Sequence, residues 1–317
     1  MSRFKVGVSA LFDPADTPHA RTFLRAMTVA RNGIPGFDHV HWQFCDDGAN
    51  PARAEQVARQ LVAAKVDLVI GHFSSDAAMV AAGIYRQAGI GLLSPAATID
   101  CLTQDNPNVF RFCPSDRHLA KDLVAWLRLR HRKWTCVHID ADPSAHGQAL
   151  AKVIAQAASD SGIRRTVDRE QAQVEVFAGR LANSREHWHA RRRSGSQRPL
   201  VLTDDAASPY LGNAAAQDTN TYVIGFGATA SAANESASHR ALFGAEPETY
   251  FRESLLMFHV LAQLARRSWR PTELLHALNQ ETFATPLGAV SFDQGECRGA
   301  RTSLWQVGVA GLMPIAD

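Results

Sequence analysis

Residues 68–98, LVIGHFSSDAAMVAAGIYRQAGIGLLSPAAT, contain the pattern that decides the fold. A short apolar run over 66–70 stops at Gly71, which is typical of a strand buried on both faces of a parallel sheet. A polar turn and a helical stretch follow over 74–87, and a second apolar run follows over 90–93. The stretch therefore predicts a strand–helix–strand unit whose two strands end at the same edge of one sheet.

Hydroxyl side chains follow both of these predicted strands. Ser74 and Ser75, with Asp76, come after the first strand, and Thr98 comes shortly after the second. Each of them could simply cap a helix, since these residue types bond the free N–H groups of a first helical turn. Together they lie at the carboxyl edge of the sheet, where open α/β sheets bind ligands. Both interpretations remain open from the residues alone.

Composition limits the classes of protein that the chain can belong to. It has 317 residues, 46% hydrophobic and 20% charged, which is long enough for two lobes. A formal net charge of +2 is too small to indicate nucleic-acid binding, and we interpret the arginines at 191–193 as a solvated helix end. No apolar run reaches the eighteen or so residues of a membrane span, so none is expected.

Strands and helices alternate along the rest of the chain, which predicts parallel sheets built from crossover units. We expect strands over 5–10, 41–44, 135–139, 164–167, 200–202 and 222–225, with helices over 20–32, 116–130, 148–159, 176–191, 247–266 and 272–279. The segment 229–246 is expected to be a loop. Two last strands, over 288–292 and 303–309, are expected around a hairpin-like connection.

The sequence contains no motif that indicates catalysis. A dinucleotide fingerprint, a phosphate-loop lysine, HExxH and a Gly-x-Ser-x-Gly elbow are all absent. Asp46 and Asp47 follow a predicted strand, but no further carboxylates converge on them, so a turn-capping role is favoured over a metal site. His72 precedes the serine turn without an acid in register to make it a base for Ser75. We therefore expect no catalytic residues, no metal and no cofactor.

The motifs as a set resemble a known family. VIGH at 69–72, the serine turn, SPAAT at 94–98, QFCDD at 43–47 and PLGAVSFDQG at 286–295 occur in the family's order. The chain resembles the branched-chain amino-acid (Leu/Ile/Val) binding proteins of ABC transporters, which are type I periplasmic binding proteins, and the related amide-sensor proteins. The resemblance covers nearly the whole chain.

The resemblance implies an α/β fold with two Rossmann-like lobes, parallel sheets and three interlobe crossovers. The expected crossovers lie near residues 112–118, 243–248 and 288–295. Lobe 1 is expected to comprise residues 1–113 plus 246–290, and lobe 2 residues 114–245 plus 291–317.

The resemblance also implies which residues bind a ligand. The Ser75 and Thr98 side chains and the backbone of Ala96 are expected to hold the polar head of a small molecule, with Ser74 and Asp76 beside them. His146 stands where the family has an aromatic side chain that closes over the ligand. Alternatively, His146 is an ordinary histidine of a surface loop.

One position departs from the family in a way that concerns the ligand. Gly227 occupies the place where amino-acid binders carry an acid that pairs with the ligand's ammonium group. Because a buried ammonium without a counter-charge is costly, either Asp204 or Asp205 takes over that role or the ligand has no ammonium. We therefore expect a modified amino acid, an amide or a small carboxylate rather than leucine, isoleucine or valine.

Two roles follow from the resemblance. The first is the substrate-binding component of an ABC transporter, whose partner is a permease, and the second is a cytoplasmic ligand sensor that acts on a regulatory protein. The location is expected to be cytoplasmic if Met1 is the native start, or periplasmic if a leader was removed. Five cysteines without metal-type spacing indicate reduced thiols, and Ala49 and Ser74 stand where family members often have a disulfide.

Overall fold

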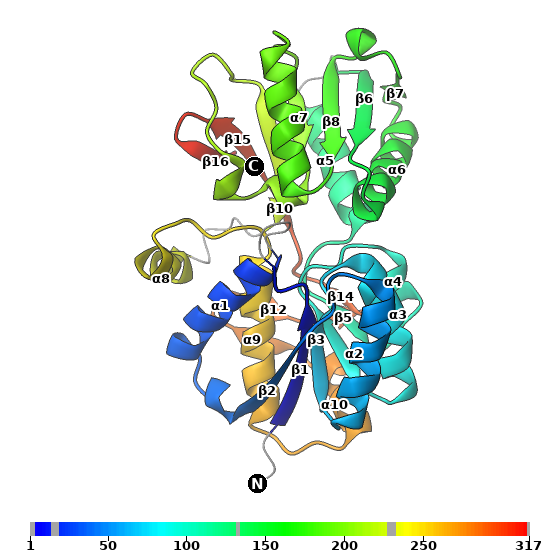
Figure 1. Ribbon diagram of the computed structural model, residues 1–317, viewed down its shortest axis with the longest axis vertical. Coiled ribbons are helices and arrows are strands. Elements are labelled where there is room, and N and C mark those ends of the chain that lie inside the picture. Colours follow the sequence, from blue (N-terminus) through cyan, green and yellow to red (C-terminus); the bar gives the residue numbers. More distant parts are fainter. Residues whose placement is uncertain (1–3, 14–18, 131–133, 227–232, 316–317) are drawn as a thin grey trace.

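The computed structural model describes residues 4–13, 19–130, 134–226 and 233–315. They form two α/β lobes, one above the other, each built on a seven-stranded sheet (Figure 1). The strand order is β13-β14-β5-β4-β3-β1-β2 in the first sheet and β16-β15-β10-β9-β8-β6-β7 in the second. The predicted fold class is confirmed.

The first lobe contains the beginning of the chain and a later segment. Its strands are β1 (Phe4–Ala10), β2 (Val40–Asp46), β3 (Leu68–Gly71), β4 (Gly91–Ser94), β5 (Val109–Arg111), β13 (Phe292–Asp293) and β14 (Glu296–Cys297). Its helices are α1 (His19–Gly33), α2 (Pro51–Ala63), α3 (Ser75–Gln87), α4 (Cys101–Gln104), α8 (Ala233–Phe243), α9 (Phe251–Ala265) and α10 (Pro271–Gln280), with a 3-10 turn η1 (Phe37–His39). A separate hairpin joins β11 (Phe283–Thr285) to β12 (Gly288–Val290).

The second lobe contains the middle of the chain and its last strands. The strands are β6 (Cys136–Ala141), β7 (Arg164–Arg165), β8 (Val174–Ala178), β9 (Leu200–Leu202), β10 (Thr221–Phe226), β15 (Thr302–Gly308) and β16 (Gly311–Pro314). The helices are α5 (Asp116–Arg130), α6 (Ala145–Asp160) and α7 (Leu181–Arg193), with 3-10 turns η2 (Arg169–Gln171), η3 (Asp204–Ala206) and η4 (Pro209–Leu211). In this sheet β15 runs antiparallel to both of its neighbours, β10 and β16, and the other pairs are parallel.

The deciding stretch folds as β3, α3 and β4. All residues of both strands are buried, as their continuous apolar runs predict. Gly71 has φ +119°, and a Cβ there would lie 1.9 Å from the Ser9 carbonyl oxygen. Glycine at this position therefore allows β3 to approach β1 closely where the chain turns toward α3.

Three expectations about single elements were wrong. The strand expected over 288–292 is divided between β12 and β13, and β15 lies in the other lobe's sheet, so they form no hairpin with it. The helix predicted over 176–191 is in fact strand β8 followed by α7, because β-forming valines occupy the buried start and Gly179 separates the two elements. The loop predicted over 229–246 contains helix α8, whose alanine-rich sequence favours helix.

The crossovers also differ in part from expectation. The first lies between β5 and α5, as expected. Helix α8 already packs against α1, so the chain has returned to the first lobe before Ala233, earlier than 243–248. Strands β13 and β14 belong to the first sheet, so the third crossover lies between Cys297 and Thr302. The lobe boundary expected at residue 291 is therefore wrong, because the short β13–β14 hairpin completes the first sheet beside β5.

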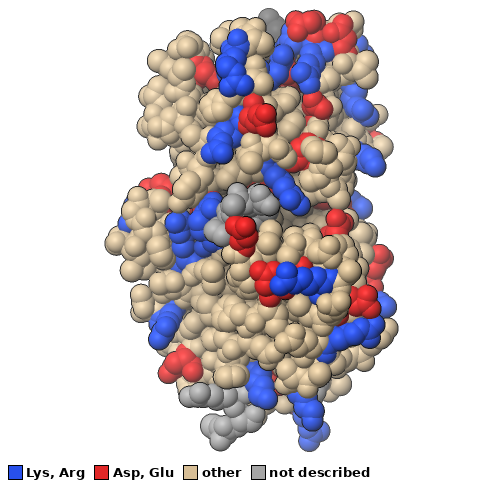
Figure 2. Space-filling model, viewed as in Figure 1, with Lys and Arg blue, Asp and Glu red and all other residues tan. Residues whose placement is uncertain are grey.

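The surface carries no broad field of one charge on the side drawn in Figure 2. Lysine and arginine side chains lie among aspartates and glutamates over both lobes. Within the described residues, no helix is long and apolar enough to cross a membrane.

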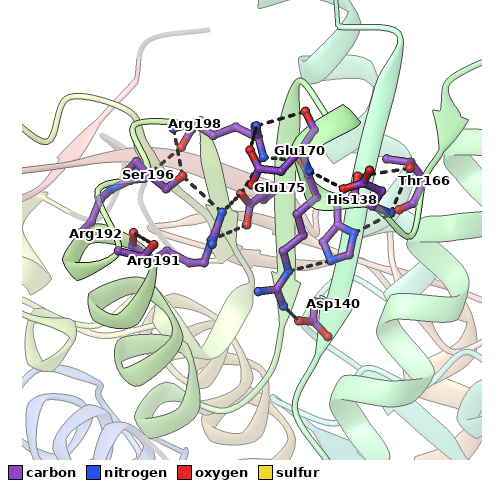
Figure 3. A network of polar contacts seen from close by, with 12 residues as sticks. His138, Asp140, Thr166, Glu170, Glu175, Arg191, Arg192, Ser196 and Arg198 are labelled. Carbon is purple, nitrogen blue, oxygen red and sulfur yellow. Dashed lines mark hydrogen bonds and ion pairs between the residues drawn. The ribbon is translucent and has the colours of Figure 1, made fainter.

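A network of ion pairs braces the end of the second lobe that carries the start of β8 (Figure 3). Glu175 in β8 is 2% exposed and accepts two hydrogen bonds from Arg191, at 2.8 and 2.6 Å. Arg198 approaches the same carboxylate at 3.5 Å and pairs with Glu170 at 3.2 Å. The buried charge of Glu175 is thus shared by two guanidinium groups.

We predict that Glu175→Gln destabilises the second lobe by roughly 3 kcal/mol, because it leaves Arg191 and Arg198 without their buried counter-charge. Urea unfolding of the two proteins measures the difference. Arg240→Gln breaks the exposed Arg240–Glu246 pair and serves as control, with a change within about 1 kcal/mol. Equal losses in the two variants would contradict the role assigned to Glu175.

Helix α9 carries an acid at the junction of the lobes. Glu253 is fully buried, and neither carboxylate oxygen has a hydrogen-bond partner among the described residues. Its charge is felt by Cys113 and Cys297, which lie at the first and third crossovers. Burial raises the pKa of Glu253 to about 7, although the charge of Arg252 opposes the shift.

This shift makes stability depend on pH in a defined direction. The unfolded chain loses the Glu253 proton near pH 4.5, whereas the folded protein keeps it to about pH 7, so stability falls as the pH rises through that window. We predict that Glu253→Gln removes this fall and is more stable than wild type at pH 8 by on the order of 3 kcal/mol. Urea unfolding at pH 5 and pH 8 tests this. Glu186→Gln, at an exposed position of α7, should follow wild type.

Candidate functional site

A small cavity lies between the lobes, where the carboxyl ends of both parallel sheets face each other. The first lobe contributes Ser74, Ser75, Ala96 and Thr98 to its lining, beside apolar surface from Leu11 and Phe73. The second lobe contributes His146, Arg180 and Asp205. Polar groups from two lobes therefore converge on one enclosed space, which is the usual arrangement of a small-ligand site.

The serine turn offers unused donors to this cavity. Ser74 is the N-cap residue of α3, but its hydroxyl makes no capping hydrogen bond. The first N–H groups of a helix lack partners within the helix, and the helix dipole adds positive potential there. This end of the cavity is therefore suited to an anionic group such as a carboxylate.

The turn after β4 is held in place by its own hydrogen bonds. The Ser94 hydroxyl accepts the N–H of Ala97 at 3.1 Å, and the carbonyl of Thr98 accepts the N–H of Asp116 at 2.9 Å. The N–H of Ala96 makes no hydrogen bond with any described residue. It stays available beside the serine hydroxyls.

A buried network supports the serine turn from behind. His72 Nδ1 lies 2.8 Å from Asp47 Oδ2, and His72 Nε2 lies 2.9 Å from the Tyr85 hydroxyl. Ser9 donates to the same Asp47 oxygen at 2.8 Å. Both ring nitrogens of His72 are thus engaged by structural partners, which leaves neither for activating Ser75.

The acidic pair after β2 caps its own turn, as favoured from the sequence. Asp46 accepts the N–H of Gly48 at 2.7 Å, and Asp47 accepts the N–H of Ala49 at 2.8 Å. Among the described residues, no group of three or more metal-ligating side chains is close enough to hold a metal ion.

One carboxylate fixes the second-lobe side of the cavity. Asp142 accepts the N–H of Arg180 at 2.8 Å and the Asn183 side chain at 2.9 Å, at the start of α7. Its other oxygen accepts the N–H of Ser144, which caps α6. These hydrogen bonds outweigh burial and lower the pKa of Asp142. The starts of the helices that carry His146 and Arg180 are therefore tied to a single charged group.

His146 lies beside a buried acid of the second lobe. Its Nε2 lies 3.4 Å from the fully buried Asp204 carboxylate. Burial disfavours the charged ring, but Asp204, with Asp205 and Asp116 nearby, outweighs it and raises the pKa of His146 to about 10. In return, His146 and the Tyr250 hydroxyl hold the pKa of Asp204 below its usual value despite burial.

Contacts between the lobes close the cavity. His19 of α1 lies 3.0 Å from Asp205, and its ring meets that of Tyr250 edge-on at 4.7 Å. Tyr250 donates to Asp204 at 2.7 Å and has φ +68°, an uncommon backbone conformation for a bulky residue. Such conformations persist where surrounding contacts hold them, often at ligand-binding sites.

The structure brings together most of the side chains that the sequence predicted. Ser74, Ser75, Ala96, Thr98, His146 and Asp205 all line the cavity. Asp76 does not, because it is exposed in the first turn of α3. Gly227 lies outside the described residues.

Arg180 and Tyr250 also line the cavity, and the sequence did not predict either of them. Arg180 directly follows β8, and the prediction of a helix over 176–191 concealed its position at a carboxyl edge of the sheet. Recognising that strand would have indicated the residue. Tyr250 precedes α9 without any local pattern that points to the cavity.

Comparison with known proteins agrees with this architecture. The family described as "Periplasmic binding protein" matches residues 24–178. The chain is similar to Leu/Ile/Val-binding protein homolog 3 of Brucella melitensis, with 29% identity over 50% of the chain and 42% of that protein. It is also similar to Leu/Ile/Val-binding protein homolog 1 of Brucella abortus, with 24% identity over 78% of the chain and 74% of that protein.

Solved structures share the fold over nearly the whole chain. A substrate-binding protein of an ABC transporter from Desulfitobacterium hafniense, in complex with Leu, has a TM-score of 0.80 and 21% identity, covering 98% of this chain and 99% of that one. A solute-binding protein from Rhodopseudomonas palustris BisB5, in complex with 3,4-dihydroxybenzoic acid, has a TM-score of 0.81 and 17% identity, covering 99% and 96%.

Proposed function

Because the chain belongs to the type I periplasmic-binding-protein family, we propose that it captures a small polar ligand reversibly between its lobes, as the substrate-binding component of an ABC importer. One observation carries the proposal. The cavity sets the donors of Ser75, Ala96 and Thr98 opposite charged side chains of the second lobe. We propose that no catalysis accompanies binding and that a permease is the partner.

Hydrogen bonds from these groups can supply enough free energy to bind a small ligand. Closing two lobes over a ligand removes water and strengthens each polar contact. A hydrogen bond to a charged group contributes roughly 1.5–3 kcal/mol, so four or five of them can offset association and closure and leave micromolar affinity or better.

The ligand we propose is a modified amino acid, an amide or a small carboxylate. Asp205 is the second-lobe acid that lines the cavity, and it already pairs with His19. A leucine-type ligand would need a carboxylate for its buried ammonium group. The similar solved structures hold both Leu and an aromatic acid, which supports a ligand range wider than branched-chain amino acids.

A cytoplasmic ligand sensor, acting on a regulatory protein, is the second candidate. All five cysteines are free thiols, which suits a reducing compartment. The importer role implies a periplasmic location. Fractionating native cells by osmotic shock, with an antibody to the protein, distinguishes these roles: release with the periplasmic fraction favours the importer, and retention favours the sensor.

We predict that Ser75→Ala and Thr98→Ala each weaken binding by about 1.5–3 kcal/mol if the bonded ligand group is charged. Isothermal titration measures this with the ligand that gives the largest thermal shift in a screen of amino acids, amides and carboxylates. Ser194→Ala, at an exposed position at the end of α7, is the control.

Unchanged affinity in both variants would remove Ser75 and Thr98 from the site. Strong stabilisation by leucine or valine, with none by acids or amides, would contradict the proposed ligand class.

A further inference from the structure

We infer that Arg180 forms a second anion-binding group in the interlobe cavity, so that the ligand is a compact dicarboxylate. The inference rests on the proposed function, since it takes this cavity as the ligand site. It goes further because it assigns a residue to the far end of the ligand and names the chemistry found there.

Arg180 differs from the other half-buried arginines of its lobe. Arg191 and Arg198 pair with Glu175 at the opposite end of the lobe (Figure 3), and Arg192 pairs with Asp218. The guanidinium of Arg180 makes no ion pair or hydrogen bond with any described residue, although Arg180 is only partly exposed and is one of the residues that line the cavity. A guanidinium group matches a carboxylate in two-pronged geometry, so this is a site prepared for an acid.

The scaffold under Arg180 is rigid. Asp142 accepts the backbone N–H of Arg180. It also accepts the N–H of Ser144, which caps the helix that carries His146. A Cβ at Gly147 would lie 2.3 Å from Asp142 Oδ1, and a Cβ at Gly179 would lie 2.9 Å from Asp142 Oδ2. Close packing around one carboxylate thus fixes the backbone of Arg180 beside the cavity, as a preorganised site requires.

The two acids of η3 do not offer a free partner to a ligand cation. Asp204 contacts His146 and Tyr250, and Asp205 contacts His19. Among the described residues that line the cavity, the charged residue without a partner is therefore Arg180. At the other end, the start of α3 also favours negative charge. Both ends of the cavity are thus suited to carboxylates.

The test compares acids of matched length. Isothermal titration of the full chain with succinate and with butyrate, which has the same carbon number and one carboxylate fewer, should show roughly tenfold or greater preference for succinate. Malonate and glutarate extend the series to shorter and longer spacing. Arg180→Gln should lower affinity for the preferred dicarboxylate by roughly tenfold or more and leave butyrate unchanged. Arg193→Gln removes a charge from an exposed position of the same helix and should leave both affinities as in wild type.

Three results would each overturn the inference. They are equal affinity for succinate and butyrate, no binding of any dicarboxylate, and an Arg180→Gln variant whose affinity for the dicarboxylate equals that of wild type. If an amide or amino acid then binds and Ser75→Ala weakens it, the inference falls and the proposed function stands. If no solute shows binding that depends on Ser75, both fall.

Discussion

Parallel strands impose the constraint on which the rest of this structure depends. Consecutive parallel strands need a crossover, so β1, β3 and β4 all end at one edge of the first sheet, and β6, β8 and β9 end at one edge of the second. The three crossovers then bring these two edges face to face (Figure 1). Residues that follow strands in distant parts of the chain, such as Ser75 and Arg180, meet for this reason alone.

The buried acids between the two sheet edges are each paired with another side chain. The Asp204 carboxylate raises the pKa of His146, and Tyr250 donates to the second oxygen of that carboxylate. Asp205 is matched by His19 from the other lobe. A buried carboxylate is costly without such partners, so the paired acids Asp204 and Asp205 help to hold the site together. Arg180 belongs to neither of these pairs. This difference distinguishes Arg180, which we propose contacts the ligand, from the paired groups that hold the structure.

How much could be predicted from sequence depended on how local the signal was. The unit β3–α3–β4 was predictable because its apolar runs, turn residues and glycine are adjacent, and most of the candidate site followed from it. Strand β8 was not predicted, because helix α7 begins only three residues after the strand ends and the two were predicted as one helix. The two-residue strands β13 and β14 give no periodic signal, so the third crossover was misplaced. The His19–Asp205 contact joins residues 186 positions apart, which no local pattern encodes.

The contacts between the lobes include more polar groups than the packing within them. Each lobe is held by an apolar interior, as where Phe258 of α9 packs against Phe23 and Phe37. Across the cleft, the Ser208 hydroxyl donates to Glu248 at 2.7 Å and His19 lies 3.0 Å from Asp205, beside a ring contact between Phe226 and Tyr250. Water can replace polar contacts of this kind when they are exposed, whereas it cannot replace buried apolar packing. Separation of the lobes should therefore cost far less than unfolding either one, and a ligand that adds a few charged hydrogen bonds across the cleft is enough to decide between open and closed states.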